Sequence, residues 1–305
     1  TVTDYEEDSI ERKVSLNNNF AHLEYKDTKI NLIDTPGYAA FVSHARPALR
    51  VADCALVVVD GVNGIEVQTE KTWSYANEFL LPRFMVINKL DKERSEFGHA
   101  LDTAKESFAR SIVPFTLPIG SETNFKGVVD VVHQKAYEFD EHGKAKEIPI
   151  PETGRDVFET ARERLIEIVA ESDDDLMEKY FENGTLDEED IYPNLAKAIA
   201  KSKLCPVYAV SSINLVGLSI LLDHIVEFAP NPATHEAEYG FANPEGAGDR
   251  LMRKYSNDEP FSAYVFRTIA DPFAGRINVM KVVSGKISSD ATVFNSSRDS
   301  AERLG

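Results

Sequence analysis

Three short polar clusters each follow a run of apolar residues, and their residue types suit the binding of a phosphorylated ligand. The first is Asp34-Thr35-Pro36-Gly37, the second is Asn88-Lys89-Leu90-Asp91, and the third is Ser211-Ser212. A carboxylate such as Asp34 can hold Mg²⁺, directly or through water. A glycine such as Gly37 lets a backbone N–H approach a phosphate without a side chain in the way. The clusters therefore predict a nucleotide-type site.

The second cluster is suited to the recognition of guanine. Asp91 can accept N–H bonds from ring N1 and the 2-amino group, Asn88 can meet the O6/N7 side, and the Lys89 stem can cover the base. Adenine would leave the carboxylate without donors, which costs about 1–3 kcal/mol per lost bond. Ser211 and Ser212 would place backbone N–H groups near the base. In isolation so short a motif is also compatible with a capped turn between a strand and a helix.

The elements that position these clusters are four short apolar runs, Ile30–Ile33, Cys54–Val59, Phe84–Ile87 and Cys205–Val210. Continuous apolar runs are typical of strands buried on both faces of a parallel sheet. Helical periodicity over 69–80, with Trp73 in the core, and over 217–229 predicts a doubly wound α/β domain. Ligands bind at the carboxyl ends of such strands, so the clusters, with Asp60-Gly61, should converge on one crevice.

The domain organisation is predicted from breaks in this pattern. Residues 1–119 hold the first part of the α/β domain, and FTLPIGS, at residues 115–121, is a candidate for a further strand of its sheet. More than a hundred residues separate the third apolar run from the fourth, which is too many for one crossover. Residues 120–202 are therefore expected to form an inserted α+β subdomain. Residues 203–232 complete the domain, 233–257 form a linker, and 258–305 begin an antiparallel β-barrel.

Composition sets further limits. The net charge of −18 argues against a protein that coats nucleic acid through general phosphate attraction. No apolar run approaches the roughly 18 residues of a membrane-spanning helix, and the acidic start predicts no signal peptide. Cys54 and Cys205 are expected to be buried thiols in a reducing cytosol. His44 and His224 have no partners at metal-ligand spacing, so no zinc site is expected.

Taken together, the motifs resemble a known family. DTPG, NKLD and SSINLVG are similar to the third, fourth and fifth signature elements of a GTPase, and the stretch beginning LIDTPGYAAFVSHARPALRVADCALVVVDG resembles the translational GTPases, elongation factor G in particular. GVVDVVHQKAYEF resembles the subdomain inserted in elongation factor G. FRTIADPFAGRINVMKVVSGKI resembles the start of its second, β-barrel domain. The resemblance spans essentially the whole chain.

The resemblance implies a P-loop-NTPase-type fold that binds GTP or GDP with Mg²⁺, and a monomeric cytoplasmic GTPase that acts with the ribosome. Asp34 and Gly37 would serve magnesium and the γ-phosphate as part of switch II, and the NKLD and serine residues would contact guanine. SIERKVSL aligns with switch I, so that Ser15 replaces the threonine that reaches magnesium. Lys13 stands where the family usually has glycine.

Two departures from the family bear on activity. No G-x-x-x-x-G-K-[ST] motif occurs in the sequence, so the loop that cradles the phosphates is expected upstream of Thr1. Tyr38 replaces the switch II histidine that orients the attacking water. A phenol is mainly a hydrogen-bond donor to water, which predicts slower hydrolysis; an aromatic side chain that plugs the space beside switch II is the structural alternative. The functional alternatives are a guanine-nucleotide-binding regulator with little turnover and a ribosomal-protection GTPase.

Overall fold

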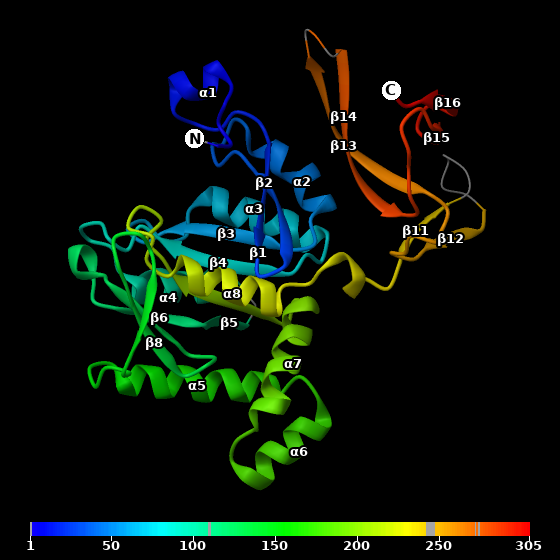
Figure 1. The fold of residues 1–305 in the computed structure, drawn as a ribbon. Helices are drawn as coiled ribbons and strands as arrows, with labels where there is room; N and C mark the ends of the chain where they lie inside the picture. Colours follow the sequence, from blue (N-terminus) through cyan, green and yellow to red (C-terminus); the bar gives the residue numbers. More distant parts are fainter. Residues whose placement is uncertain (1, 109–110, 242–247, 272, 274) are drawn as a thin grey trace. The chain divides into compact units, whose positions relative to one another are not determined.

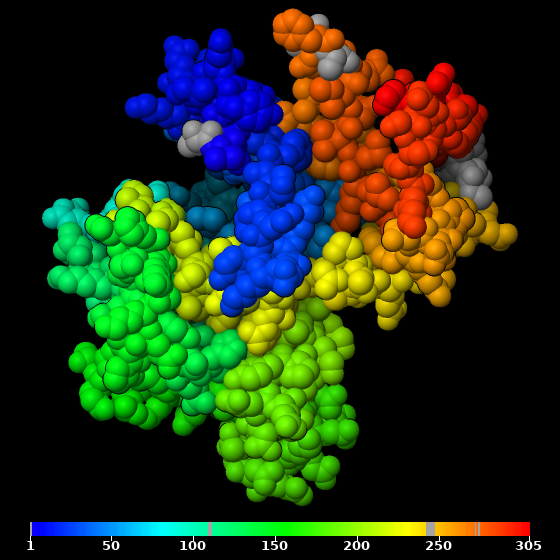
Figure 2. All heavy atoms as spheres, in the orientation of Figure 1, coloured from blue at the N-terminus to red at the C-terminus, as the bar shows by residue number. Residues whose placement is uncertain are grey.

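The computed structural model describes residues 2–108, 111–241, 248–271, 273 and 275–305 (Figure 1). The chain divides into two compact units, Thr1–Pro230 and Asn231–Gly305, which are described separately. In the first unit, α6 (Asp174–Asn183) and its neighbouring loops form a lobe that protrudes from the rest of the surface (Figure 2). Among the described residues, no helix is long and apolar enough to cross a membrane.

The first unit is built on a four-stranded parallel sheet in the order β3-β4-β10-β5. Its strands are Ala55–Asp60, Arg83–Asn88, Leu204–Ala209 and Ser111–Pro114. Every residue of β10, and all but the last of β4, is buried, which requires cover on both faces. Helices α3 (Val67–Glu78), α4 (Phe97–Ser107) and α8 (Leu218–Phe228) flank this sheet. The predicted α/β fold is therefore confirmed.

The prediction that Ile30–Ile33 is a strand of the parallel sheet is wrong. This run lies in β2 (Thr28–Asp34), which pairs antiparallel with β1 (Asn19–Tyr25) as a separate two-stranded sheet. Lys26 and Asp27 have φ values of 46° and 57°, so they form the tight turn that joins two antiparallel strands. At this turn, the Tyr25 hydroxyl donates a 2.6 Å hydrogen bond to Asp223 on α8.

A second, antiparallel sheet has the order β6-β7-β8-β9. Its strands are Thr116–Ile119, Gly127–Asp130, Lys135–Phe139 and Ala145–Ile148. FTLPIGS thus contains a strand, but of this sheet rather than the parallel one, whose fourth strand is β5. Phe115 joins the two sheets, because its N–H donates to the Val207 carbonyl at 2.8 Å and its carbonyl accepts from the Val131 N–H at 2.9 Å.

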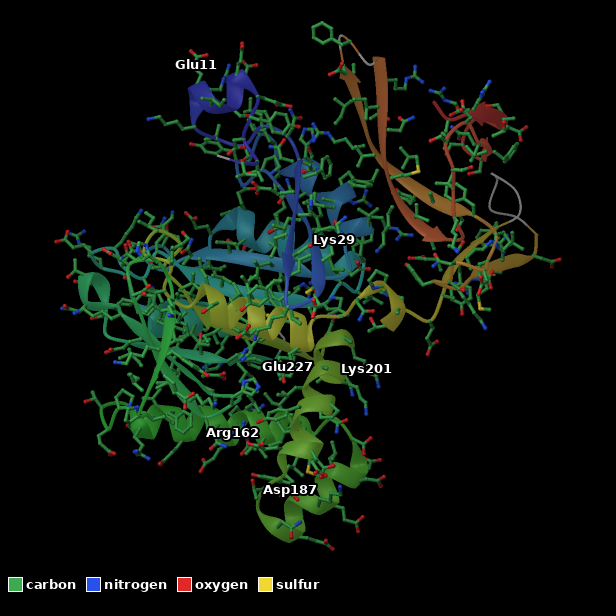
Figure 3. All side chains as sticks on the ribbon, in the orientation of Figure 1. Glu11, Lys29, Arg162, Asp187, Lys201 and Glu227 are labelled. Atoms are coloured by element: carbon green, nitrogen blue, oxygen red, sulfur yellow. The ribbon has the colours of Figure 1, made fainter. Side chains whose placement is uncertain are left out.

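The helices of the insertion are α5 (Arg155–Ala170), α6 and α7 (Glu188–Ala200). Arg162 on α5, labelled in Figure 3, donates from Nη1 to the carbonyls of Val131 and Val132 at 3.2 and 2.7 Å. These bonds satisfy two carbonyls beyond the end of β7 and fix α5 on the second sheet. The buried core runs without a break from the parallel sheet through this insertion.

The second unit contains only antiparallel pairs among its described residues: β11 with β12, β13 with β14, and β15 with β16. The strands are Glu238–Phe241, Arg250–Arg253, Ser262–Asp271, Gly275–Ser284, Thr292–Asn295 and Ser300–Arg303. The expected linker 233–257 therefore holds a β pair, and its residues 242–247 lie outside the described residues. The remaining helical elements are α1 (Glu7–Arg12), α2 (Ala45–Val51), η1 (Val42–His44), η2 (Glu122–Asn124) and η3 (Pro232–Thr234).

Phe115 should be a main determinant of stability. Its side chain is fully buried and makes edge contacts with Tyr208, His224 and Phe228 at ring distances of 5.8–5.9 Å. We expect Phe115→Ala to lower the free energy of unfolding by about 3–5 kcal/mol, measured by urea denaturation. Phe181→Ala, at a residue that is 79% exposed, is the matched control and should change it by less than about 0.5 kcal/mol. Equal losses in the two variants would contradict this assignment.

Candidate functional site

Three strands of the parallel sheet end level with one another. Asp60 at the end of β3 is in register with Asn88 at the end of β4, and Ala209 at the end of β10 is in register with Ile87. The loops that follow these strands consequently start at one edge of the sheet. This edge is where an open parallel sheet binds its ligands.

Asn88 ties the loop after β4 to the loop after β10. Its Oδ1 accepts the backbone N–H groups of Lys89 and Ser212 at 2.8 and 3.0 Å, and its Nδ2 donates to the Ser212 hydroxyl at 3.1 Å. The carboxamide oxygen is therefore engaged within the protein. In this structure Asn88 positions the two loops, while one N–H of its amide remains available to a ligand.

Asp91 is oriented by Ser211. The Ser211 hydroxyl is fully buried and donates a 2.5 Å hydrogen bond to Asp91 Oδ1, while it accepts the N–H of Asn214 at 3.2 Å. Within the described chain this is the one hydrogen bond to the half-buried Asp91 carboxylate, which has room for about four. The remaining acceptor positions can meet paired N–H donors of a base.

Lys89 pairs with Asp60 rather than with the serine loop. Its backbone is left-handed (φ 63°), and its Nζ donates to Asp60 Oδ2 at 2.6 Å. Burial alone would raise the pKa of Asp60, but the hydrogen bonds from Lys89 and from the Val62 N–H outweigh it and lower that pKa. The ion pair holds the Lys89 stem beside the strand ends, where it can cover a planar ligand.

Asp60 and Gly61 also belong to this site. From the sequence we expected them at the carboxyl edge of the sheet, without a specific role. The Gly61 N–H donates to the Asn88 carbonyl at 2.8 Å, and a Cβ on Gly61 would lie 2.9 Å from Leu90 Cδ2 and 3.0 Å from that same carbonyl oxygen. Only glycine allows the two loops to come this close. The sequence pattern placed both residues in the predicted crevice, but it could not show that Asp60 pairs with Lys89.

The predicted switch II residues lie on a separate element. Asp34 ends β2 and is half-buried, and Thr35, Pro36 and Gly37 continue from it without regular structure. A Cβ on Gly37 would meet open space, so its N–H faces no steric obstacle. In the described chain, no hydrogen bond or ion pair joins these residues to the loops after β4 and β10.

Tyr38 does not plug the structure. Its side chain is 63% exposed, so the alternative in which it fills the space beside switch II is wrong. Its carbonyl accepts the Phe41 N–H at 2.9 Å and opens the turn that leads into η1 and α2. The phenol is accordingly free to face solvent or a partner.

The predicted switch I residues follow α1. Lys13 caps the carboxyl end of this helix in a left-handed conformation (φ 54°, ψ 38°), with its N–H on the Ser9 carbonyl. Lysine thus adopts here the conformation that glycine adopts most readily. Ser15 lies two residues further on, half-buried in the loop, and the structure shows no bond from its hydroxyl among the described residues.

Comparisons with known proteins identify the family to which this fold belongs. The sequence profile of the elongation factor Tu GTP binding domain matches residues 1–231. An elongation factor G-like protein from Thermotoga maritima is 35% identical over 302 residues, which cover 99% of this chain and 43% of that protein. A crystal structure of a Thermus thermophilus protein superposes with a TM-score of 0.84 at 29% identity, and the match covers 100% of this chain and 42% of the other.

The fold and the strand-end loops thus define a GTP-binding domain of the elongation factor Tu type. More closely, the chain belongs to the elongation factor G family of translational GTPases. It spans less than half the length of the two relatives that it matches.

The loop links make a prediction about stability. Asn88→Ala removes three hydrogen bonds, of which the two to Ser212 join the loops after β4 and β10 and the third, from the Lys89 N–H, is local, and it should lower the free energy of unfolding by about 1–3 kcal/mol. Thermal and urea unfolding without nucleotide measure this loss. Asn63→Ala, which removes one 3.4 Å bond at an exposed residue, serves as control. If both variants unfold at the wild-type midpoint, Asn88 does not hold the loops.

Proposed function

We propose that this chain is the nucleotide-binding part of a translation factor that binds GTP and hydrolyses it to GDP and phosphate on the ribosome. The observation that carries the proposal is the pair of links Asn88–Ser212 and Asp91–Ser211, which orient a carboxylate with free acceptor positions at the sheet edge. Family membership supports guanine as the base. On this proposal Asp91 binds N1 and the 2-amino group, and Lys89 covers the ring.

The phosphate end of the ligand is assigned to the residues after β2 and α1. Asp34 and Ser15 are both half-buried oxygen donors, which is the ligand type that Mg²⁺ prefers, so the donor set fits this ion. On this proposal Asp34 and Ser15 hold Mg²⁺, which neutralises phosphate charge when bound. Gly37 offers its N–H to the γ-phosphate, and Thr35 and Pro36 set the path of the loop between Asp34 and Gly37.

The α- and β-phosphates need a further group of donors, which we assign to a glycine-rich loop on another strand. Strand β3 supports this assignment, because it is an edge strand of the described parallel sheet and one face of it is uncovered, with Leu56 and Val58 44% and 59% exposed. Edge strands are usually protected by charges, whereas these side chains are apolar and suit burial by a neighbouring element. Pairing with β3 would bring such a loop to the carboxyl edge where Asp60 and Asn88 lie.

Hydrolysis depends on the attacking water, and Tyr38 occupies the position beside the γ-phosphate loop. The exposed phenol can donate a hydrogen bond to water, but at neutral pH it is a poor acceptor of a proton. We propose that turnover is accordingly slow until a partner such as the ribosome orders this segment. The fuller role, in translocation or a related ribosomal step by a cytoplasmic monomer, is part of the same proposal.

Tyr38 also favours one second candidate function, a regulator that acts through nucleotide occupancy rather than turnover. In that case GTP would bind and ribosome contact would follow, but phosphate would not be released. A ribosomal-protection GTPase shares the same domain and would be separated from both by rescue of translation in the presence of a drug.

Ribosome-stimulated hydrolysis tests the proposal. We expect single-turnover phosphate release by the protein that includes the phosphate-binding segment. Tyr38→His should increase the rate of this release by about 10²–10⁴-fold, because the imidazole can accept a hydrogen bond from the attacking water. Tyr38→Phe is the matched control and removes only the hydroxyl. Equal rates for the wild type and Tyr38→His would contradict the role of Tyr38, and nucleotide binding without any release would favour the regulator.

A further inference from the structure

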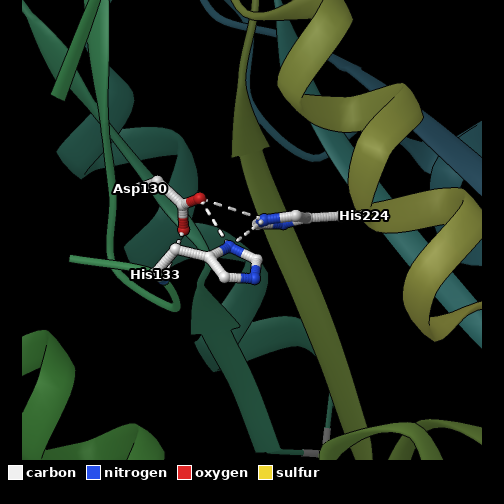
Figure 4. A group of neighbouring side chains, drawn as sticks. All are labelled: Asp130, His133 and His224. Carbon is white, nitrogen blue, oxygen red and sulfur yellow. Dashed lines mark hydrogen bonds and ion pairs between the residues drawn. The ribbon is translucent and has the colours of Figure 1, made fainter. Parts of the chain in front are cut away.

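Asp130, His133 and His224 form a compact cluster that includes none of the residues assigned to the nucleotide (Figure 4). Asp130 ends β7 and His133 lies in the turn before β8, whereas His224 comes from α8. The expectation that His224 has no partners at metal-ligand spacing is therefore wrong. Its partners are 94 and 91 residues away in the chain, so local spacing could not show them.

The three facing atoms make a nearly equilateral triangle. Asp130 Oδ2 lies 2.8 Å from His133 Nδ1 and 3.2 Å from His224 Nε2, and the two nitrogens are 3.2 Å apart. Tetrahedral zinc with bonds of about 2.0–2.1 Å has ligand atoms about 3.3–3.4 Å from one another. Movements of a few tenths of an ångström would therefore turn this triangle into one face of a zinc site.

The surroundings hold each ligand in place. Asp130 Oδ1 accepts the N–H groups of Val132 and His133 at 2.9 and 3.0 Å, which leaves Oδ2 aimed at the imidazoles. His133 Nε2 lies 3.2 Å from Glu227 Oε2, the carboxylate–histidine arrangement common behind metal ligands. Such outer partners fix the ring orientation and increase the basicity of the ligating nitrogen.

His224 is held by packing rather than by a second hydrogen bond. Its ring is fully buried among Phe115, Tyr208 and Phe228, at ring distances of 5.4–5.8 Å. Its Nδ1 is buried and has no hydrogen-bond partner among the described residues, so Nε2 is the only nitrogen through which this side chain interacts with a polar group. Nε2 is therefore the nitrogen through which His224 could coordinate a cation.

Access and competition with protons also follow from the structure. The His133 side chain is 27% exposed, whereas those of Asp130 and His224 are buried, so His133 is the member of the cluster nearest to solvent. The hydrogen bond to Asp130, with help from Glu227, raises the pKa of His133 to about 10. A metal ion therefore has to displace a proton at neutral pH.

We propose that Asp130, His133 and His224 bind one divalent transition-metal ion of the zinc type, with water as the fourth ligand. Two imidazoles and one carboxylate favour zinc or cobalt over the hard ions Mg²⁺ and Ca²⁺. The ion ties the turn after β7, in the inserted sheet, to α8, the last helix of the first unit. Its role is to fasten the insertion to the GTP-binding domain, and it does not depend on nucleotide.

Metal titration of the intact chain tests the proposal. After treatment with a chelator and its removal, we expect one Zn²⁺ per chain by calorimetry, and Co²⁺ should give the visible absorption of a tetrahedral site. His133→Ala should weaken Zn²⁺ binding by at least about tenfold. Zn²⁺ should also raise the unfolding temperature of the wild type but not of this variant.

The controls separate this site from others. His133→Ala is the main variant because that side chain is partly exposed, whereas His224→Ala opens the core and is checked first by circular dichroism. His142→Ala, at a highly exposed histidine beside Glu141, should bind Zn²⁺ like the wild type. Absence of stoichiometric binding, or equal affinity of the wild type and His133→Ala, would overturn the proposal and leave a proton-shared His–Asp–His contact.

Discussion

The level ending of β3, β4 and β10 is the constraint on which the rest of the site depends. Because these parallel strands share one register, the loops after them emerge together and can be joined by short side chains. Asn88–Ser212 and Asp91–Ser211 then link the loops after β4 and β10, and Lys89–Asp60 links the loop after β4 to the end of β3. The same residues that would contact a base thus hold the loops before any base arrives, which lowers the cost of ordering them on binding.

A second consequence concerns the insertion. The chain passes from β5 directly through Phe115 into β6, so the parallel and antiparallel sheets share backbone hydrogen bonds and one core. α8 contacts the β1–β2 hairpin as well as the insertion, because its Asp223 accepts a hydrogen bond from Tyr25 and its His224 faces Asp130. A cation at that cluster would strengthen a connection that the fold already makes.

The local sequence pattern was sufficient to predict many of the strands and helices, but not which strands and side chains pair with one another. The uninterrupted apolar runs of β4 and β10 correctly predicted buried strands of a parallel sheet, and Trp73 lies in the core as periodicity indicated. The run of β3 also forms a strand of this sheet, but the prediction that it is buried on both faces is wrong, because Leu56 and Val58 are exposed. Ile30–Ile33 was wrongly assigned to the parallel sheet, although Asn31 interrupts the apolar run. The turn at Lys26-Asp27, which makes this run part of an antiparallel hairpin, contains neither glycine nor proline to mark it. The positions of Asn88, Asp91 and Ser211 followed from strand ends, but the Lys89–Asp60 pair and the His224 contacts join segments distant in sequence, which no short window can show.

The central claim is that Asp91 selects guanine through the 2-amino group. Competitive calorimetry with GDP and inosine diphosphate, which lacks only that group, tests it most directly on the intact protein. Loss of one hydrogen bond to a charged acceptor costs about 1.5–3 kcal/mol, which predicts that GDP binds about 10–100 times more tightly than inosine diphosphate. Equal affinity for the two nucleotides would contradict the account.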